Sequence, residues 1–69
     1  MAVYKMLELV GTSDQNFSDA VERTLRKIGR TEKVRWFHVT QWRGSCATDG
    51  AILYQVHVEV GVATEPALE

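Results

Sequence analysis

The residues best suited to binding chemistry lie on two segments that have the pattern of β-strands. The segment 34–43 contributes Trp36, His38 and Trp42, and the segment 51–62 contributes Gln55 and His57. Because successive side chains of a strand point to opposite faces, strict alternation puts all five on one face of a sheet. An indole offers a plane for stacking, and an amide offers both a donor and an acceptor. This combination indicates a site for a planar heteroaromatic ligand with mixed hydrogen-bonding edges.

The register of the two segments decides which side chains can share one site. With a turn between the segments, Trp36 is expected opposite His57 or Glu59. This register places Gln55 beside or diagonal to Trp36, within reach of a large side chain. The opposite face of the first segment is then expected to carry the remaining residues, which are Arg35, Phe37, Val39, Gln41 and Arg43.

The same residues have simpler interpretations, which stay open at this point. Strand tryptophans commonly pack in a core or a subunit interface, and Trp36 would then have a structural role only. His38, His57 and Glu59 share a face and could hold a metal ion, but paired histidines are more often solvated or in interfaces, so we predict no metal site. Cys46 lies in a turn with no base expected nearby. We therefore predict no catalytic residues and no enzymatic activity.

Hydrophobic periodicity places a strand and then a helix before these segments. The strand is predicted over 3–10 and is expected to end at Gly11. The run at 12–15 fits a capping box, in which the Thr12 hydroxyl accepts from the backbone N–H of Gln15. An apolar stripe at helical spacing follows this start. The stripe consists of Phe17, Ala20, Val21, Leu25 and Ile28.

The two later segments are expected to form a hairpin whose second strand is central. Asp49-Gly50 is the strongest turn signal between them. The segment 51–62 is the longest and the richest in valine, as a central strand should be. These features predict an α+β fold of order β-α-β-β, with a three-stranded antiparallel sheet of order 1-3-2 and one helix packed on one face. The helix is expected to cover Phe37, Val39, Tyr54, Val56 and Val58.

The length of the chain favours self-association. The 69 residues are expected to form one domain over 1–63, with a flexible C-terminal tail at 64–69. A chain this short buries only roughly 60% of its unfolded surface, so small domains usually add disulfides, a metal or oligomerisation. Cys46 is the only cysteine, which excludes a disulfide within the chain. Oligomerisation remains, and it agrees with a sheet that is apolar on both faces.

Charge and hydropathy exclude several classes of partner. The formal net charge is −1, so no basic excess is available for binding nucleic acid. No apolar run approaches the ~18 residues of a membrane span, and the first residues lack the pattern of a signal peptide. We therefore expect a cytoplasmic protein with neither nucleic acid nor membrane as a partner.

Short motifs spread over nearly the whole chain resemble the dodecin family. Each motif is weak alone, but their order and spacing agree with that family from about residue 3 to residue 61. The motifs are Val10-Gly11-Thr12-Ser13, Trp36-Phe37, Arg43-Gly44, Tyr54-Gln55-Val56 and Val60-Gly61.

The resemblance implies a flavin-binding protein that assembles with itself. Dodecins form a hollow homododecamer and bind flavins in pairs between symmetry-related tryptophans, for storage and photoprotection. The resemblance assigns the stacking role to Trp36 and a hydrogen bond with the flavin ring to Gln55. Gln41 and Arg43 fall where family members contact the ribityl chain or phosphate of riboflavin, FMN or FAD. Some bacterial members also bind coenzyme A.

Two further functions remain as alternatives. The chain could be a structural assembly module that binds another ligand, such as coenzyme A, or a small flavin-dependent redox protein. In addition, His38 and His57 are expected on the binding face. Their protonation would make binding sensitive to pH near pH 6.

Overall fold

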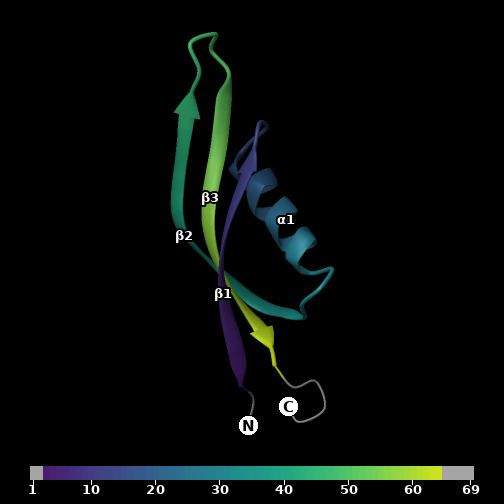
Figure 1. Cartoon of the computed structure of the whole chain (residues 1–69). Helices are drawn as coiled ribbons and strands as arrows, with labels where there is room; N and C mark the ends of the chain where they lie inside the picture. Colours follow the sequence, from purple (N-terminus) through teal and green to yellow (C-terminus); the bar gives the residue numbers. More distant parts are fainter. Residues whose placement is uncertain (1–2, 65–69) are drawn as a thin grey trace.

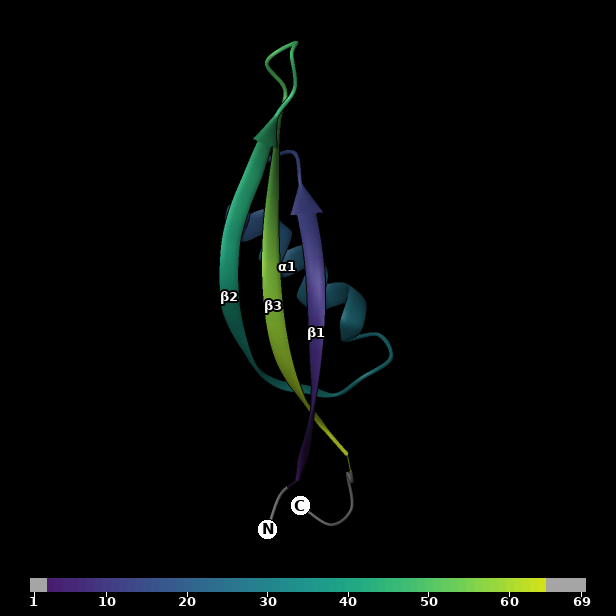
Figure 2. The same ribbon diagram turned by 60° about the vertical axis from the view of Figure 1, so that its left-hand side comes forward.

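The computed structural model describes residues 3–64 and has the predicted β-α-β-β order (Figure 1). The three strands form one antiparallel sheet in which the third strand of the chain lies between the first and the second, and the helix lies on one face of the sheet (Figure 2). The α+β fold class is therefore confirmed. Of the expected tail, all but Thr64 lies outside the described residues. The elements are β1 (Tyr4–Ser13), α1 (Phe17–Ile28), β2 (Val34–Cys46) and β3 (Ile52–Ala63).

The hydrophobic core lies between α1 and the central strand β3. Four valines alternate along β3 and point at the helix, each without exposed surface. Burying such a side chain contributes about 1.5–3 kcal/mol, so this row is the main source of stability in the protomer. The predicted helical stripe is confirmed for four of its five residues, because Ala20 and Val21 belong to this core and Phe17 and Leu25 pack against it, whereas Ile28 lines a groove beside β1. The fully buried valines are Val56, Val58, Val60 and Val62.

A glycine in β1 allows the helix to lie close to the sheet. A Cβ atom on Gly11 would occupy the position of the Thr24 hydroxyl, which donates to the Ala20 carbonyl at 2.7 Å. The expectation that β1 ends at this glycine is wrong. The strand continues to Ser13, because residues 11–13 extend the antiparallel ladder with β3.

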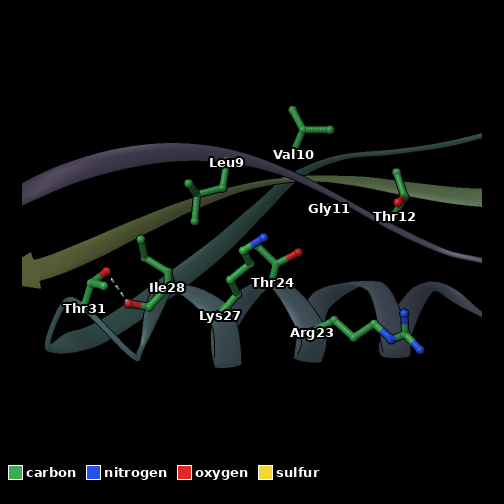
Figure 3. A pocket seen from close by; sticks show the side chains of 9 residues that line it. All are labelled: Leu9, Val10, Gly11, Thr12, Arg23, Thr24, Lys27, Ile28 and Thr31. Atoms are coloured by element: carbon green, nitrogen blue, oxygen red, sulfur yellow. Dashed lines mark hydrogen bonds between the residues drawn. The ribbon is translucent and has the colours of Figure 1, made fainter.

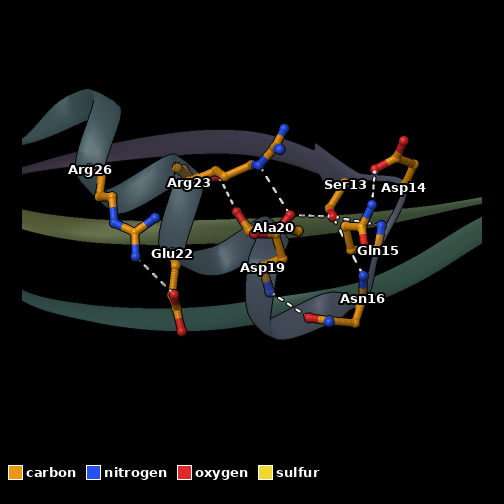
Figure 4. A network of polar contacts seen from close by, with 10 residues as sticks. Ser13, Asp14, Gln15, Asn16, Asp19, Ala20, Glu22, Arg23 and Arg26 are labelled. Carbon is orange, nitrogen blue, oxygen red and sulfur yellow. Dashed lines mark hydrogen bonds and ion pairs between the residues drawn. The ribbon is translucent and has the colours of Figure 1, made fainter.

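The start of α1 also differs from the predicted capping box. The N-cap is Asn16, whose Oδ1 accepts from the Asp19 backbone N–H at 2.7 Å (Figure 4). The buried Ser13 hydroxyl donates to the Asp19 carboxylate at 2.6 Å and accepts from the Gln15 N–H at 2.9 Å. Thr12 is held in the ladder of β1 and takes no part in this network. The prediction that polar side chains cap the start of the helix is therefore correct, but the capping residue is Asn16 and not Thr12.

Two β-bulges interrupt the alternation of β2. The register with β3 shifts between Val34 and Trp36 and again between Val39 and Gln41, so Arg35 and Thr40 are extra residues without a partner. Each extra residue reverses the faces of the side chains that follow it. As a result, the helix side of β2 carries the residues opposite the buried valines, which are Val34, Phe37, Val39 and Trp42.

The protomer is elongated and leaves apolar surface uncovered. It measures 52 × 20 × 13 Å, and the β2–β3 hairpin extends beyond the helix (Figure 1). The helix lies against β1 and β3 and leaves much of β2 open, so Phe37 and Trp42 are 50% and 55% exposed. Such surface on a small chain is typical of a subunit interface. Among the described residues, no helix is long and apolar enough to span a membrane.

Candidate ligand-binding face

The sheet face opposite α1, here called the open face, holds the candidate site (Figure 2). The pairing of the strands arranges its side chains in rows that cross β1, β3 and β2. One apolar row is followed along β3 by three rows with polar side chains, so the face offers both stacking surface and hydrogen-bonding groups. The rows are Met6–Gly61–Trp36, Glu8–Glu59–His38, Val10–His57–Gln41 and Thr12–Gln55–Arg43.

The indole of Trp36 lies against Gly61, its partner on β3. Its ring atoms occupy the place where a Cβ atom of any other residue would stand. Trp36 nevertheless remains 41% exposed, so part of its ring is available for stacking. Gly61 entered the sequence analysis only as part of a family motif, although a glycine inside a valine-rich strand is a recognised signal of close approach.

Two polar contacts lie farther along the open face. The Gln55 side-chain nitrogen Nε2 is 3.2 Å from Nε2 of His57, which is two residues away on the same strand. In the row between these residues and Trp36, Nδ1 of His38 is 3.4 Å from a Glu59 carboxylate oxygen. Within residues 3–64, no three acidic, histidine or cysteine side chains are grouped so that they could hold a metal ion.

The bulges change the predicted membership of the site. Trp36 and Gln55 share the uncovered face, as predicted. Gln41 and Arg43 also lie on this face, opposite His57 and Gln55, whereas strict alternation had put them on the helix side. The bulge at Thr40 is the physical reason, because it shifts every later residue of β2 by one position.

The same bulge removes Trp42 from the predicted site. Its ring lies on the helix side and packs edge-on against Phe17, with ring centroids 5.3 Å apart and planes at 87°. Phe17 makes a second edge contact with Tyr54 at 5.1 Å. The prediction that both tryptophans share one face is therefore wrong, and Trp42 belongs to an aromatic cluster at the start of α1.

The predicted proximity of Trp36 and Gln55 is also wrong. Trp36 pairs with Gly61 rather than with His57 or Glu59, and Gln55 pairs with Arg43. The two rows are six positions apart on β3, which is about 20 Å at ~3.3 Å per residue. One protomer therefore cannot bring the indole and the amide to one small ring.

A separate groove lies between β1 and α1, on the helix side of the sheet (Figure 3). Its volume is about 660 Å³. It combines the Leu9 side chain of β1 with Arg23 and Lys27 from the helix, and Arg23 also pairs with Asp19 at 3.0 Å. None of the predicted site residues lines this groove. The lining residues are Leu9, Val10, Gly11, Thr12, Arg23, Thr24, Lys27, Ile28 and Thr31.

Comparison with known proteins identifies the family. The Dodecin family model matches residues 3–65, and the chain belongs to the dodecin family. A dodecin from Thermus thermophilus is 39% identical over 64 residues, which are 91% of this chain and 93% of the relative. A crystal structure of a protein from Thermus thermophilus has a TM-score of 0.85 at 38% identity and covers 94% of this chain and 97% of its own.

A more distant structure supports the assignment of the fold alone. It is described as a calcium-chelating antigen, calcium dodecin, from Mycobacterium tuberculosis. It has a TM-score of 0.84 at 22% identity and covers 99% of each chain. As a family, dodecins are small, dodecameric flavin-binding proteins, and they are known as non-catalytic.

Proposed function

We propose that this protein is a non-catalytic flavin-binding protein that stores and photoprotects riboflavin, FMN or FAD. The flavins would lie in pairs between symmetry-related Trp36 side chains of a hollow homododecamer. The observation that carries the proposal is the half-exposed indole of Trp36, seated on Gly61 in the uncovered face of the sheet. An indole fixed in this way is a ready plane for a flat, aromatic ring.

The separation of Trp36 from Gln55 supports a site shared between protomers. The two rows lie about 20 Å apart on one sheet, so a flavin that uses both must take the indole from one subunit and the amide from another. A two-fold contact between open faces is isologous, so it creates two equivalent sites. Each site combines the indole of one subunit with the amide of the other. The contact therefore accommodates flavins in pairs, as the proposal requires.

The remaining site residues suit the non-aromatic parts of a flavin. Arg43 lies opposite Gln55 and is exposed, and a guanidinium can bind a phosphate group with two parallel hydrogen bonds. Gln41 lies one row closer to Trp36, opposite His57. We assign Arg43 to the phosphate of FMN or FAD and Gln41 to the hydroxyl groups of the ribityl chain.

Stacking also explains why such a site would protect rather than catalyse. An electron-rich indole in contact with a photoexcited flavin returns it rapidly to the ground state, so the trapped flavin takes little part in light-driven side reactions. A flavin with both ring faces covered has no open face for a substrate. The uncovered apolar surfaces of the protomer support the shell, because each subunit can bury them against its neighbours.

A flavin titration with two tryptophan variants tests the proposal. Riboflavin, FMN and FAD are titrated with the protein while flavin fluorescence is followed. Trp36→Ala should keep the oligomer but lower the affinity about tenfold or more, since one aromatic stack is worth roughly 1–3 kcal/mol. Trp42→Ala is the matched control, because it removes an indole that is also exposed, 55% against 41% for Trp36, but lies on the other side of the sheet.

The alternatives predict different results. If Trp36 only packs a subunit interface, Trp36→Ala should dissociate the oligomer in size-exclusion chromatography. A structural module would quench none of the three flavins. A flavin-dependent redox protein would oxidise a reduced nicotinamide in steady state, which the proposal excludes.

A further inference from the structure

The contact between Gln55 and His57 couples the protonation of the imidazole to the direction of the amide. The Nε2 atom of Gln55 can only donate a hydrogen bond, so Nε2 of His57, 3.2 Å away, must accept it. An imidazole that accepts at Nε2 is neutral and carries its hydrogen on Nδ1. In this arrangement the Gln55 carbonyl oxygen points away from His57.

Protonation of His57 reverses this arrangement. Both nitrogens of an imidazolium carry hydrogen, so Nε2 of His57 would then face another donor. A half-turn of the Gln55 amide restores the hydrogen bond by bringing its oxygen to the imidazole. The amide then directs its N–H₂ group, instead of its oxygen, away from His57. A change of one proton therefore exchanges an acceptor for a donor at this point of the open face.

The charged neighbours of His57 come from all three strands. Its direct partners across the ladder, Val10 and Gln41, do not titrate. Glu59 lies two residues away on β3, and Glu8 and His38 lie opposite Glu59 on β1 and β2. Arg43 lies opposite Gln55 on β2. The helix lies on the other face and contributes no group.

We propose that His57 determines which edge of a ligand ring Gln55 recognises. With neutral His57, the amide oxygen accepts from a ring N–H, so the site selects heteroaromatic imides such as the pyrimidine edge of a flavin. With protonated His57, the amide donates to a ring carbonyl, and a ring N–H no longer matters. This inference rests on the proposed function, in which Gln55 contacts the flavin ring.

Comparing riboflavin with a ligand methylated at the imide nitrogen measures the preference for a ring N–H. In N3-methylriboflavin the imide N–H is replaced, while the ring and its carbonyl groups remain. At pH 8 riboflavin should bind about tenfold more tightly than N3-methylriboflavin, which corresponds to one hydrogen bond. At pH 5.5 the preference should fall to about twofold. Dissociation constants from fluorescence quenching give both ratios.

Three variants separate His57 from the other titrating groups. His57→Glu places an acceptor beside Gln55 and should keep the tenfold preference at both pH values. His57→Lys places a permanent donor there and should show the twofold preference at both. His38→Asn removes the other imidazole of the open face and should behave as the wild type does. Size-exclusion chromatography verifies that each variant assembles normally.

The outcomes distinguish this inference from the proposed function. If riboflavin binds but both His57 variants keep the pH dependence of the wild type, the role of His57 is refuted and flavin binding stands. If His38→Asn abolishes the pH dependence, protonation of His38 rather than His57 controls the ligand preference, and the inference is again refuted. If no flavin binds, the proposed function fails, and its ligand selection fails with it.

A measurement without ligand provides an independent check. The ¹⁵N chemical shifts of the imidazole nitrogens report which of them carries hydrogen. At pH 8 the His57 ring should have its hydrogen on Nδ1, the less common tautomer, and Gln55→Leu should remove this preference. A neutral His57 with hydrogen on Nε2 in the wild type would refute the amide orientation from which the inference starts.

Discussion

The indole of Trp36 fills the place where its partner Gly61 would otherwise carry a side chain. The stacking plane is therefore supported by the backbone of the central strand. Gly61 itself is buried, although the indole above it is 41% exposed. A backbone support cannot change rotamer, so it holds the exposed part of the indole in one orientation for a ligand.

Gly61→Ala should therefore impair both stability and binding. The new methyl group would collide with the Trp36 indole and displace it from the sheet. Overpacking of this kind costs about 1–3 kcal/mol, measurable by chemical denaturation. Flavin affinity in a fluorescence titration should fall together with stability, since the displaced indole no longer offers the same plane.

Gly50→Ala is the matched control for this substitution. Gly50 has a φ of 92° at the tip of the hairpin, and a Cβ atom added there would meet no other atom within 4 Å. Alanine there should cost about 1 kcal/mol through backbone strain alone. Flavin affinity should be unchanged. An equal loss of affinity in both variants would show that general destabilisation, and not the support of Trp36, explains the effect.

A second glycine contact determines how closely α1 packs on the sheet. Gly11→Ala should destabilise the fold by about 1–3 kcal/mol, because its methyl group would overlap the Thr24 hydroxyl. Thr24→Ala removes that hydroxyl and should recover part of the loss in the double variant, which a double-mutant cycle measures. Strictly additive losses would show that the two residues do not compete for this space.

The helix start provides a prediction that separates the observed cap from the expected capping box. Asn16→Ala should cost about 1 kcal/mol, since it leaves the Asp19 backbone N–H without its partner. Thr12→Ala should change the free energy of unfolding by less than about 0.5 kcal/mol, because Thr12 is an exposed strand residue. Urea denaturation compares the two, and the reverse order of losses would favour the capping box.

The order of elements and the sheet topology could be predicted because they follow from strong periodic signals. The valine row of β3 indicates a central strand, and the stripe from Phe17 to Leu25 faces it as expected. The end of β1 could not be predicted in the same way. Gly11 has the local signature of a strand end, but pairing with β3 outweighs it and carries the strand to Ser13.

The β-bulges explain most of what was missed at the site. No residue type marks Thr40 as an extra residue, and its role is visible only in three dimensions, where its hydroxyl donates to the His57 carbonyl at 3.2 Å. One such residue moves Arg43 onto the open face and Trp42 away from it. Alternation alone was therefore enough to place Trp36, which precedes this bulge, on the open face, but not enough to place the residues that follow the bulge.

The position of Arg43 leads to a prediction about the preferred flavin. If its guanidinium binds a phosphate, Arg43→Ala should lower the affinity for FMN about tenfold or more, because hydrogen bonds between charged groups are worth about 1.5–3 kcal/mol. Its affinity for riboflavin, which has no phosphate, should stay the same. Added salt should weaken FMN binding by the wild type more than by the variant.

Arg35→Ala is the matched control for this experiment. Arg35 is also an exposed arginine of β2, but it is the extra residue of the first bulge and has no partner on β3. Its removal makes the same change in net charge. If both variants lose FMN affinity equally, the general charge of the protein attracts the phosphate. A loss confined to Arg43→Ala would assign the phosphate to the row that Arg43 shares with Gln55, on the face that the bulge at Thr40 creates.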